Sequence, residues 1–188
     1  MRRRLIALVV PLILVLAGCG GIGNHSNAQD ANANNNGDYV QAGAVTYQLQ
    51  VSRELNQFAT EDHQYLTGLP AGTARPTPDQ LWYGVFLWAK NSSHVPQQTA
   101  DTFTIVDTAG DRYYPVPLNS SVNGYAWTAQ TLQPLDTEPG LDTTASFGPT
   151  QGGLVLFKLN TSVYNNRPLT LEIHQPGESR ISTISLDL

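Results

Sequence analysis

The chain has 188 residues and a formal net charge of −5 at pH 7. Three of its 10 basic side chains stand at positions 2–4, which leaves 7 Lys and Arg against 15 Asp and Glu, or −8, for the rest of the chain. This acidic balance argues against nucleic acid, which selects basic patches, and against a folded domain lying on anionic lipid.

Residues 1–18 have the pattern of an export signal. Three arginines precede an apolar run, Leu5–Leu16, that is too short for an ordinary membrane span. The segment Leu16-Ala17-Gly18-Cys19 resembles the lipobox of bacterial lipoproteins. That resemblance implies cleavage before Cys19, a diacylglyceryl group on its sulfur, and an exported protein anchored to the bacterial membrane with its domain outside the cytoplasm. The alternative is a plain signal peptide with a chance cysteine.

Residues 19–38 comprise the expected lipidated cysteine and a polar tether. The stretch GGIGNHSNAQDANANNNGD is rich in Asn, Gly and Ala and has almost no large apolar side chain. Such a stretch buries too little surface to offset the entropy cost of ordering, so we expect it to be flexible. Residues 39–188 have the length of one domain.

Short β-rich runs with Gly/Pro punctuation fill this domain, and no stretch shows a convincing helical period. The expected strands are Ala44–Ser52, Leu81–Asn91, Phe103–Val106, Arg112–Val116, Gly152–Leu159, Leu169–His174 and Arg180–Leu188. Alternation in the first run predicts that Val45, Tyr47, Leu49 and Val51 share one face. Asp107–Asp111 is expected to form a hairpin turn with Gly110 at positive φ. The pattern predicts an all-β fold, an antiparallel β-sandwich.

Two long connections interrupt this rhythm. Asn56–Gln80 is expected as an insertion between the first two strands, and Leu118–Gln151 is equally long for its place in a sandwich. Connections of this length are usually functional, disordered or carry structure of their own.

The strand Leu81–Asn91 is apolar on both faces. Val85, Leu87 and Ala89 lead in alternation to Asn91 and are expected in the sandwich core. Trp82, Phe86 and Trp88 then form a stripe on the opposite face, which an exported protein must cover or use for binding. The insertion carries Phe58, Tyr65, Leu66 and Leu69 as possible cover. A ligand or partner face at Trp82, Phe86 and Trp88 is the alternative.

The order of these pieces resembles the immunoglobulin-like domains of bacterial surface lipoproteins, the type that includes a secreted immunogenic antigen of mycobacteria. The resemblance rests on Lys90-Asn91-Ser92-Ser93 after the apolar strand, the Phe103–Asp107 hairpin with Gly110 and Tyr113, Leu132 to Pro139-Gly140, and Gly153–Phe157. It covers about Tyr39 to Leu188. It implies an extracellular β-sandwich whose function is mostly undefined beyond binding or interaction, and it offers no catalytic residues to carry over to this sequence. It also implies that the Asn91 side chain bonds nearby backbone to close a turn.

Other titratable residues give weaker signals. Glu61-Asp62-His63 lacks a second ligand cluster at metal spacing, and Thr60 is expected to cap a short helical turn there. Asp107 and Asp111 flank a turn, but two acids are too few to define a calcium site. The sequence contains no G-x-S-x-G, H-E-x-x-H or P-loop motif. We therefore expect no enzyme, no metal and no cofactor.

The leading hypothesis is a lipoprotein whose extracytoplasmic sandwich is a non-catalytic binding or protein-interaction module. Its expected partners are the membrane, through lipid on Cys19, and an envelope protein or small ligand. Two alternatives stay open. One is a small-ligand carrier with a groove beside the Trp82/Phe86/Trp88 face. The other is an envelope hydrolase, which would need two or more carboxylates in one cleft.

Overall fold

The computed structural model of the protein describes residues 32–33 and 37–186, so Cys19 and the expected signal lie outside it. Its strands are β1 Asn32–Ala33, β2 Tyr39–Ala42, β3 Val45–Leu55, β4 Gln80–Asn91, β5 Gln97–Gln98, β6 Thr102–Val106, β7 Arg112–Tyr113, β8 Thr131–Leu132, β9 Thr137–Glu138, β10 Gly153–Asn160, β11 Leu169–His174 and β12 Ser182–Leu186. Short helices are η1 His63–Leu66, α1 Thr144–Phe147 and η2 Thr161–Tyr164. Every strand predicted from the sequence is present, but the predicted strand Arg112–Val116 is shortened to β7, and Pro115 instead forms an isolated bridge with Phe157 of β10.

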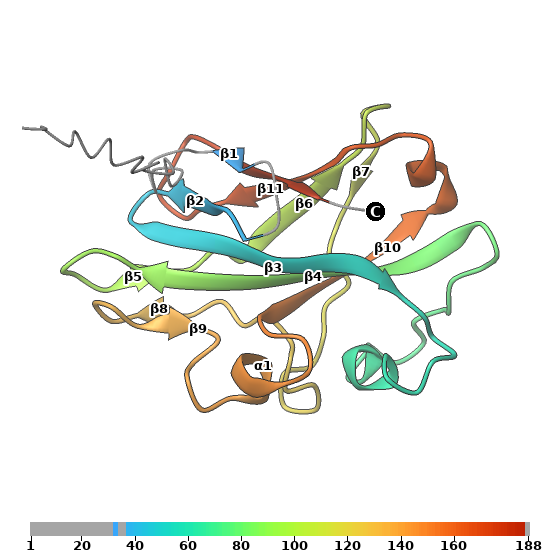
Figure 1. The fold of residues 1–188 in the computed structure, drawn as a ribbon, viewed down its shortest axis with the longest axis horizontal. Coiled ribbons are helices and arrows are strands. Elements are labelled where there is room, and N and C mark those ends of the chain that lie inside the picture. Colours follow the sequence, from blue (N-terminus) through green and yellow to red (C-terminus); the bar gives the residue numbers. More distant parts are fainter. Residues whose placement is uncertain (1–31, 34–36, 187–188) are drawn as a thin grey trace, which may run out of the picture.

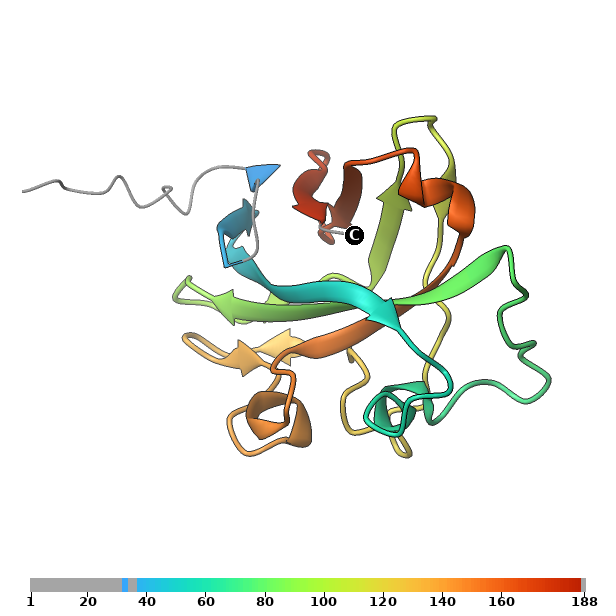
Figure 2. The ribbon, with the colours of Figure 1, turned by 45° about the vertical axis from the view of Figure 1, so that its right-hand side comes forward.

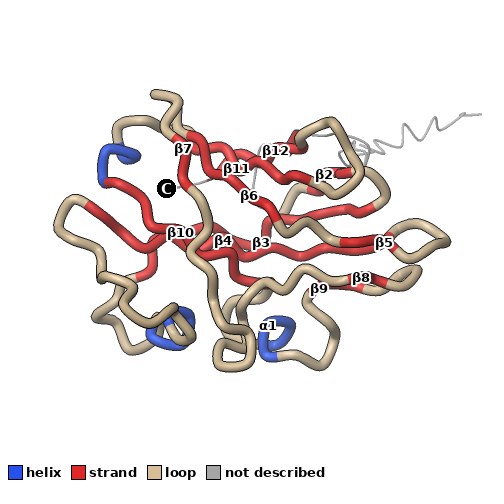
Figure 3. The backbone as a smooth tube through the Cα atoms, turned by 180° about the vertical axis from the view of Figure 1, so that it is seen from behind, coloured by secondary structure: helices blue, strands red, loops and turns tan. Residues whose placement is uncertain are grey.

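Two sheets form the sandwich (Figure 1). The central sheet has the order β10-β4-β3-β2, with β9 pairing the end of β4, and the outer sheet has the order β1-β12-β11-β6-β7. A 45° turn of the molecule shows the outer sheet above the central sheet and the two long connections below it (Figure 2). From behind, the connections are mostly irregular chain with single helical turns, η1 and α1 (Figure 3). The central sheet therefore has a layer on both of its faces.

The main core lies between the two sheets. Val85, Leu87 and Ala89 of β4 point into it, as the alternation predicted, and all three are buried. They meet apolar side chains of the outer sheet such as Ile105 and Leu171. β4 pairs with β3 on one side and β10 on the other, so the apolar run of the sequence is a central strand.

A β-bulge in β3 overturns one expectation from the sequence. Leu49 pairs with Leu87 but Val51 pairs with Phe86, so Gln50 is an extra residue in the ladder. The extra residue moves Val51 to the opposite face, where it packs against the second core below the sheet, while Tyr47 and Leu49 stay in the main core. Strict alternation was therefore right up to Leu49 and wrong for Val51.

The ordered domain begins before residue 39. β1 pairs in parallel with β12, aligning Asn32 with Thr183, and the Gly37 N–H donates to the Leu49 carbonyl at 2.8 Å. Part of the stretch expected to be a flexible tether is thus joined to both sheets. Two strands, β1 and β2, also precede β3, so the long insertion lies between the third and fourth strands rather than the first two.

The β6–β7 hairpin has the predicted turn. Gly110 has φ 89°, and Ile105 pairs with Tyr113. One carboxylate oxygen of Asp107 accepts the N–H groups of Ala109 and Asp111, both at 2.9 Å. Asp107 therefore closes its own turn.

The residues that the structure describes contain no group of three or more His, Cys, Asp or Glu side chains able to hold a metal ion.

Asn91 has the role that the family resemblance implied. Its side-chain N–H₂ donates to the carbonyls of Val95 and Leu132, at 2.8 and 3.0 Å, and its oxygen accepts the N–H of Ser93 at 2.9 Å. The side chain is fully buried, and its bond to the Leu132 carbonyl is buried as well, so water does not compete for that bond. Asn91 thus joins the end of β4 to the following turn and to β8.

Replacement of Asn91 by Ala should lower the free energy of unfolding by about 1–3 kcal/mol, because the buried bond to the Leu132 carbonyl and the acceptor of the Ser93 N–H are lost. The Val95 carbonyl keeps its bond from the Ser93 hydroxyl. Urea unfolding followed by circular dichroism measures this. Asn165→Ala, at an exposed position, is the control and should stay within about 0.5 kcal/mol of wild type. Equal stability of the two variants would contradict the role assigned to Asn91.

Candidate functional site

The stripe opposite the main core is largely covered. Trp82 is 2% exposed and Phe86 is fully buried, whereas Trp88 is half-buried. Tyr65 of η1 packs edge-on against Phe86, with ring centroids 5.1 Å apart, and against Tyr125, at 4.8 Å. The space between the insertion and the sheet is therefore a second packed core, and Trp82 and Phe86 present no open face.

A glycine interrupts the stripe for a steric reason. A Cβ atom at Gly84 would lie 3.1 Å from side-chain carbons of Leu55, Leu154 and Phe86. Such contacts are tighter than ordinary packing allows, so the second core closes over Gly84 without space for a side chain.

Both long connections build the cover, and they are bonded to each other. The buried Asn123 donates its side-chain N–H₂ to the carbonyls of Tyr65 and Thr67, both at 3.0 Å, and accepts the Tyr125 N–H at 2.9 Å. Tyr65 also donates its hydroxyl to Thr150 at 2.9 Å. The sequence pointed to the insertion alone as cover, and the structure adds the connection between Leu118 and Gln151.

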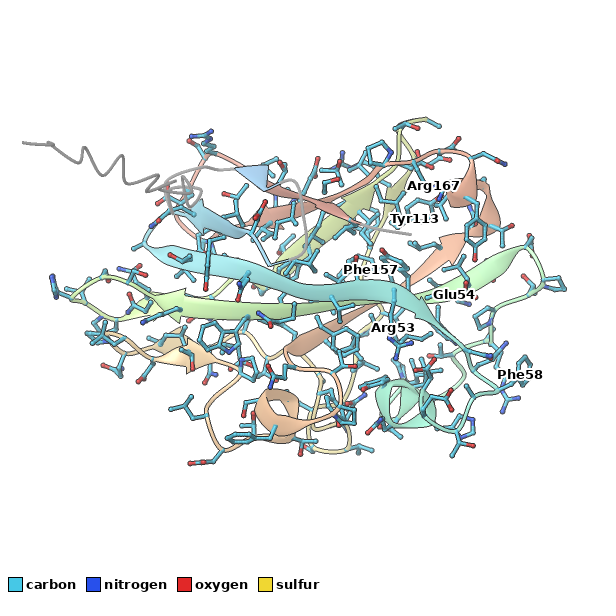
Figure 4. All side chains as sticks on the ribbon, viewed as in Figure 1. Arg53, Glu54, Phe58, Tyr113, Phe157 and Arg167 are labelled. Carbon is cyan, nitrogen blue, oxygen red and sulfur yellow. The ribbon has the colours of Figure 1, made fainter. Side chains whose placement is uncertain are left out.

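An ion pair holds the start of the insertion. Arg53, labelled at the end of β3 in Figure 4, donates to both carboxylate oxygens of Asp62, at 2.5 and 3.2 Å. The Asn56 N–H donates to the same carboxylate at 2.8 Å. Burial by itself would raise the pKa of Asp62, but the bonds from Arg53 and Asn56 outweigh it and lower the pKa. Asp62, rather than the expected Thr60, precedes η1.

The connection between Leu118 and Gln151 also carries apolar side chains that lie outside the second core and are exposed. Leu135 and Leu141 are each 69% exposed and Phe147 is 73% exposed. A groove of about 260 Å³ lies between Trp88, Leu141 and Phe147, and a second of about 390 Å³ runs between Leu135 and Leu141. Leu141 borders both grooves, so these side chains form one surface. We call Leu135, Leu141 and Phe147, with Trp88 beneath them, the Phe147 patch.

The connection that forms this region is acidic, although Lys90 of β4 pairs with Thr137 beside it. From Tyr113 to Phe157 the chain has no Lys, Arg or His and three acids, namely Asp136, Glu138 and Asp142. Asp136 and Asp142 directly follow the exposed Leu135 and Leu141. The patch therefore combines apolar side chains with negative charge.

Glu138 differs from the other two acids because it is only 6% exposed. Gln130 donates its side-chain N–H₂ to one carboxylate oxygen, and the Thr128 N–H bonds the carboxylate as well. Burial raises the pKa of Glu138, and these two bonds offset only part of that effect. Glu138 also lines a hollow of about 360 Å³ together with both donors.

Another hollow lies beside the edge of β10. It has a volume of about 470 Å³ and lies between Leu154–Leu156, the segment Tyr114–Leu118, and Trp127. The Trp127 indole N–H donates to the Ala100 carbonyl at 2.9 Å, which fixes its ring in the wall. The lining is mostly apolar, with Asp101 as its charged residue.

Sequence reasoning missed the Phe147 patch and Glu138. Leu135, Leu141 and Phe147 lie in a connection without strand or helix period, so no pattern indicates which of its side chains face solvent. The absence of basic residues from Tyr113 to Phe157 is visible in the sequence and could have directed attention there.

The fold defines the chain as an all-β sandwich. It is similar to the solved structure of the yjhA protein from Bacillus subtilis, with 12% sequence identity, a TM-score of 0.54, and coverage of 82% of this chain and 99% of that one. At this identity the likeness shows the fold alone. No protein-family model matches the sequence, and the comparison with curated proteins finds no match.

Two further solved structures are similar at TM-scores below 0.5. The proposed lipoprotein ycdA from Bacillus subtilis has 10% identity and a TM-score of 0.49, and this chain, 82% covered, spans 38% of its length. An uncharacterized beta-sandwich protein from Clostridium difficile 630 has 10% identity and a TM-score of 0.45, with coverage of 85% of this chain and 97% of that one. The fold assignment rests on the yjhA structure and on the sheets described above.

The Asp62→Asn variant should lose about 1–2 kcal/mol of unfolding free energy at pH 7, because the Arg53 ion pair is lost while the side chain stays buried. A carboxylate whose folded pKa is lowered stabilises the fold above its unfolded pKa, and this contribution is lost as the pH falls through the folded pKa. The difference between wild type and Asp62→Asn should therefore shrink below about pH 4. Urea unfolding between pH 7 and pH 2 measures it.

Glu61→Gln is the matched control for that variant, because Glu61 is the neighbouring carboxylate and is exposed. The unfolding free energy of Glu61→Gln should match that of wild type at every pH measured. A constant gap between wild type and Asp62→Asn down to the lowest pH would rule out the ion pair as its origin.

Proposed function

We propose that this protein is a non-catalytic binding module of the bacterial cell envelope that holds a polypeptide partner on the Phe147 patch. The observation that carries the proposal is the joining of three largely exposed apolar side chains, Leu135, Leu141 and Phe147, across two adjacent grooves. Single exposed apolar residues are ordinary on protein surfaces, whereas a contiguous patch rimmed by polar groups marks an interaction site.

The patch has the parts of a binding hot spot. Trp88 lies at the base of one groove, and it stands on β4, the strand held on both sides within the central sheet. A large aromatic side chain on a rigid element supplies contact area at low entropy cost. Gln48, Gln50 and Gln151 line the same groove. Gln50 donates to the Gln48 side-chain oxygen and Gln48 donates to the Gly37 carbonyl, so among the described residues of this groove the amide of Gln151 is the one of the three without such a bond.

Charge complementarity sets the chemistry of the partner. Asp136 and Asp142 border the apolar side chains, and the 113–157 stretch contains no basic residue, while Lys90 of β4 pairs with Thr137 at one edge. A partner that presents apolar anchors flanked by Lys or Arg matches this surface and associates faster because of it. The same charge supports the exclusion of nucleic acid.

Lipid attachment through Cys19 is the second part of the proposal. It is supported by the likeness of Leu16-Ala17-Gly18-Cys19 to a lipobox. The proposed relationship to immunoglobulin-like domains of surface lipoproteins fits an interaction role outside the cytoplasm. In the part of the chain that the structure describes, no helix is long and apolar enough to cross a membrane.

The structure gives less support to the two alternatives, a small-ligand carrier and an envelope hydrolase, than to a binding module. A carrier with a groove beneath the insertion needs space at Trp82 and Phe86, where the second core is packed. An envelope hydrolase needs converging carboxylates, and the hollow at Glu138 has one carboxylate in its lining. A hydrolytic activity that survives purification and is lost on substitution of one acid would refute the non-catalytic proposal.

A photo-crosslinking amino acid at position 147 should capture one basic polypeptide partner in living cells. The same amino acid at Phe58 is the matched control, because Phe58 is 77% exposed and lies on the insertion, away from the patch (Figure 4). Binding of the purified partner should weaken at least about tenfold in Phe147→Ala, the loss typical of a central apolar anchor, and stay unchanged in Phe58→Ala. Equal capture at both positions would contradict the assignment.

Lipidation is tested separately by metabolic labelling with an alkyne fatty acid. Wild type should carry the label and fractionate with membranes, because two acyl chains anchor a protein stably. Cys19→Ser should lose both the label and the membrane association, and an unchanged label in that variant would refute the anchor.

A further inference from the structure

The hollow at Glu138 is built by one connection. Its lining residues are Ser120, Asn123, Gly124, Ala126, Thr128, Gln130, Glu138, Pro139, Gly140, Thr143 and Ala145, all from the segment between Leu118 and Gln151. Hydrogen bonds hold this segment in place, including that of the Asn123 side chain to the Tyr65 carbonyl and that of the Gly152 N–H to the Ala145 carbonyl at 2.8 Å. The hollow is thus a formed site rather than a gap between loose loops.

A buried carboxylate in its wall has no cationic partner. Glu138 takes bonds from two neutral donors, Gln130 and Thr128, and among the described residues it forms no ion pair. None of the lining residues is Lys, Arg or His. A carboxylate oxygen pair accepts up to about four hydrogen bonds, so two donors leave acceptor capacity toward the hollow. Burying such a charge unpaired is unfavourable, which makes the site complementary to a positive group.

The lining narrows the class of ligand. Anions are excluded by the Glu138 charge. One carboxylate with hydroxyls is too few ligands for a calcium ion, which takes six to eight oxygens. No aromatic ring lines the hollow to stack against a sugar. What remains is an organic cation whose N–H groups meet Glu138 and hydroxyl oxygens and whose methylenes lie against Ala126, Pro139 and Ala145.

We propose that this hollow binds a primary ammonium group, carried by a free alkylamine or by the side chain of a lysine. The ammonium donates to the Glu138 carboxylate and to the hydroxyls of Thr128 and Thr143, which lie in the same lining. The volume of about 360 Å³ accommodates a four-carbon amine. The hollow and the Phe147 patch are neighbours, since Gln130 and Gly140 border both the hollow and the groove at Leu135. The proposed ammonium site does not depend on the binding role proposed for the patch.

The test is a titration of the full-length protein, in a non-ionic detergent, with n-butylammonium chloride, followed by the backbone amide NMR signals of Gly124 and Gly140. Both glycines line the hollow. We expect saturable shifts with a millimolar dissociation constant. Glu138→Gln keeps the shape of the side chain and should weaken binding at least tenfold, whereas Glu61→Gln removes an exposed acid on the insertion, outside the lining, and should change it less than twofold.

Two further probes complete the design. Butan-1-ol has the same chain without the charge and should give no saturable shift in wild type, which tests the charge requirement even if Glu138→Gln fails to fold. The peptide acetyl-Gly-Gly-Lys-Gly-Gly-amide distinguishes the sources: tighter binding than butylammonium assigns the site to a lysine side chain, and weaker binding assigns it to a free amine. Absence of saturable binding by both amines, or equal binding of butylammonium and butanol, would overturn the proposal. Loss of the Phe147 crosslink with amine binding intact would overturn only the proposed function.

Discussion

The structure depends on the need to bury both faces of β4. One face joins the main core between the sheets, as in any sandwich, while Trp82 and Phe86 on the other face cannot remain in water. Burying one large aromatic side chain contributes about 2–3 kcal/mol. Ordering each residue of the covering chain costs about 1–2 kcal/mol, so this pair offsets only part of that cost and the other side chains of the second core must supply the rest. The insertion and the Leu118–Gln151 connection supply that layer. The bulge at Gln50 adds to it by turning Val51 toward the same side.

The candidate binding surface follows from this second layer. The connection that covers Phe86 with Tyr125 and Ala145 continues into the loop that exposes Leu141 and Phe147 and encloses Glu138. Its position is set by bonds to the insertion, chiefly from Asn123. Irregular chain fixed on a sheet in this way holds polar and apolar groups in defined places, which is how loops on rigid scaffolds acquire binding roles.

Much of the fold could be predicted because its long strands carry local patterns. The two-sided apolar run predicted a central β4, and the Asp107–Asp111 turn with Gly110 predicted the hairpin, since both signals need only neighbouring residues. The candidate site could not be predicted in the same way. Leu135, Leu141 and Phe147 are as apolar as core residues, and only the folded connection leaves them exposed. Glu138 resembles the nearby Asp136 and Asp142 in sequence, and only packing makes it the buried one of the three.

The sequence by itself determined the acidic balance and the strand pattern, because composition and short periodicities express them directly. It also leads us to expect export and lipid attachment at Cys19. It also showed that Trp82, Phe86 and Trp88 required cover or a ligand. Only the tertiary structure decided that two connections cover the first two and leave Trp88 at the base of a groove. It likewise decided that residues 32–33 join the sheet. These outcomes rest on contacts between residues distant in the chain, such as Tyr65 with Phe86 and Tyr125, and no local pattern encodes such contacts.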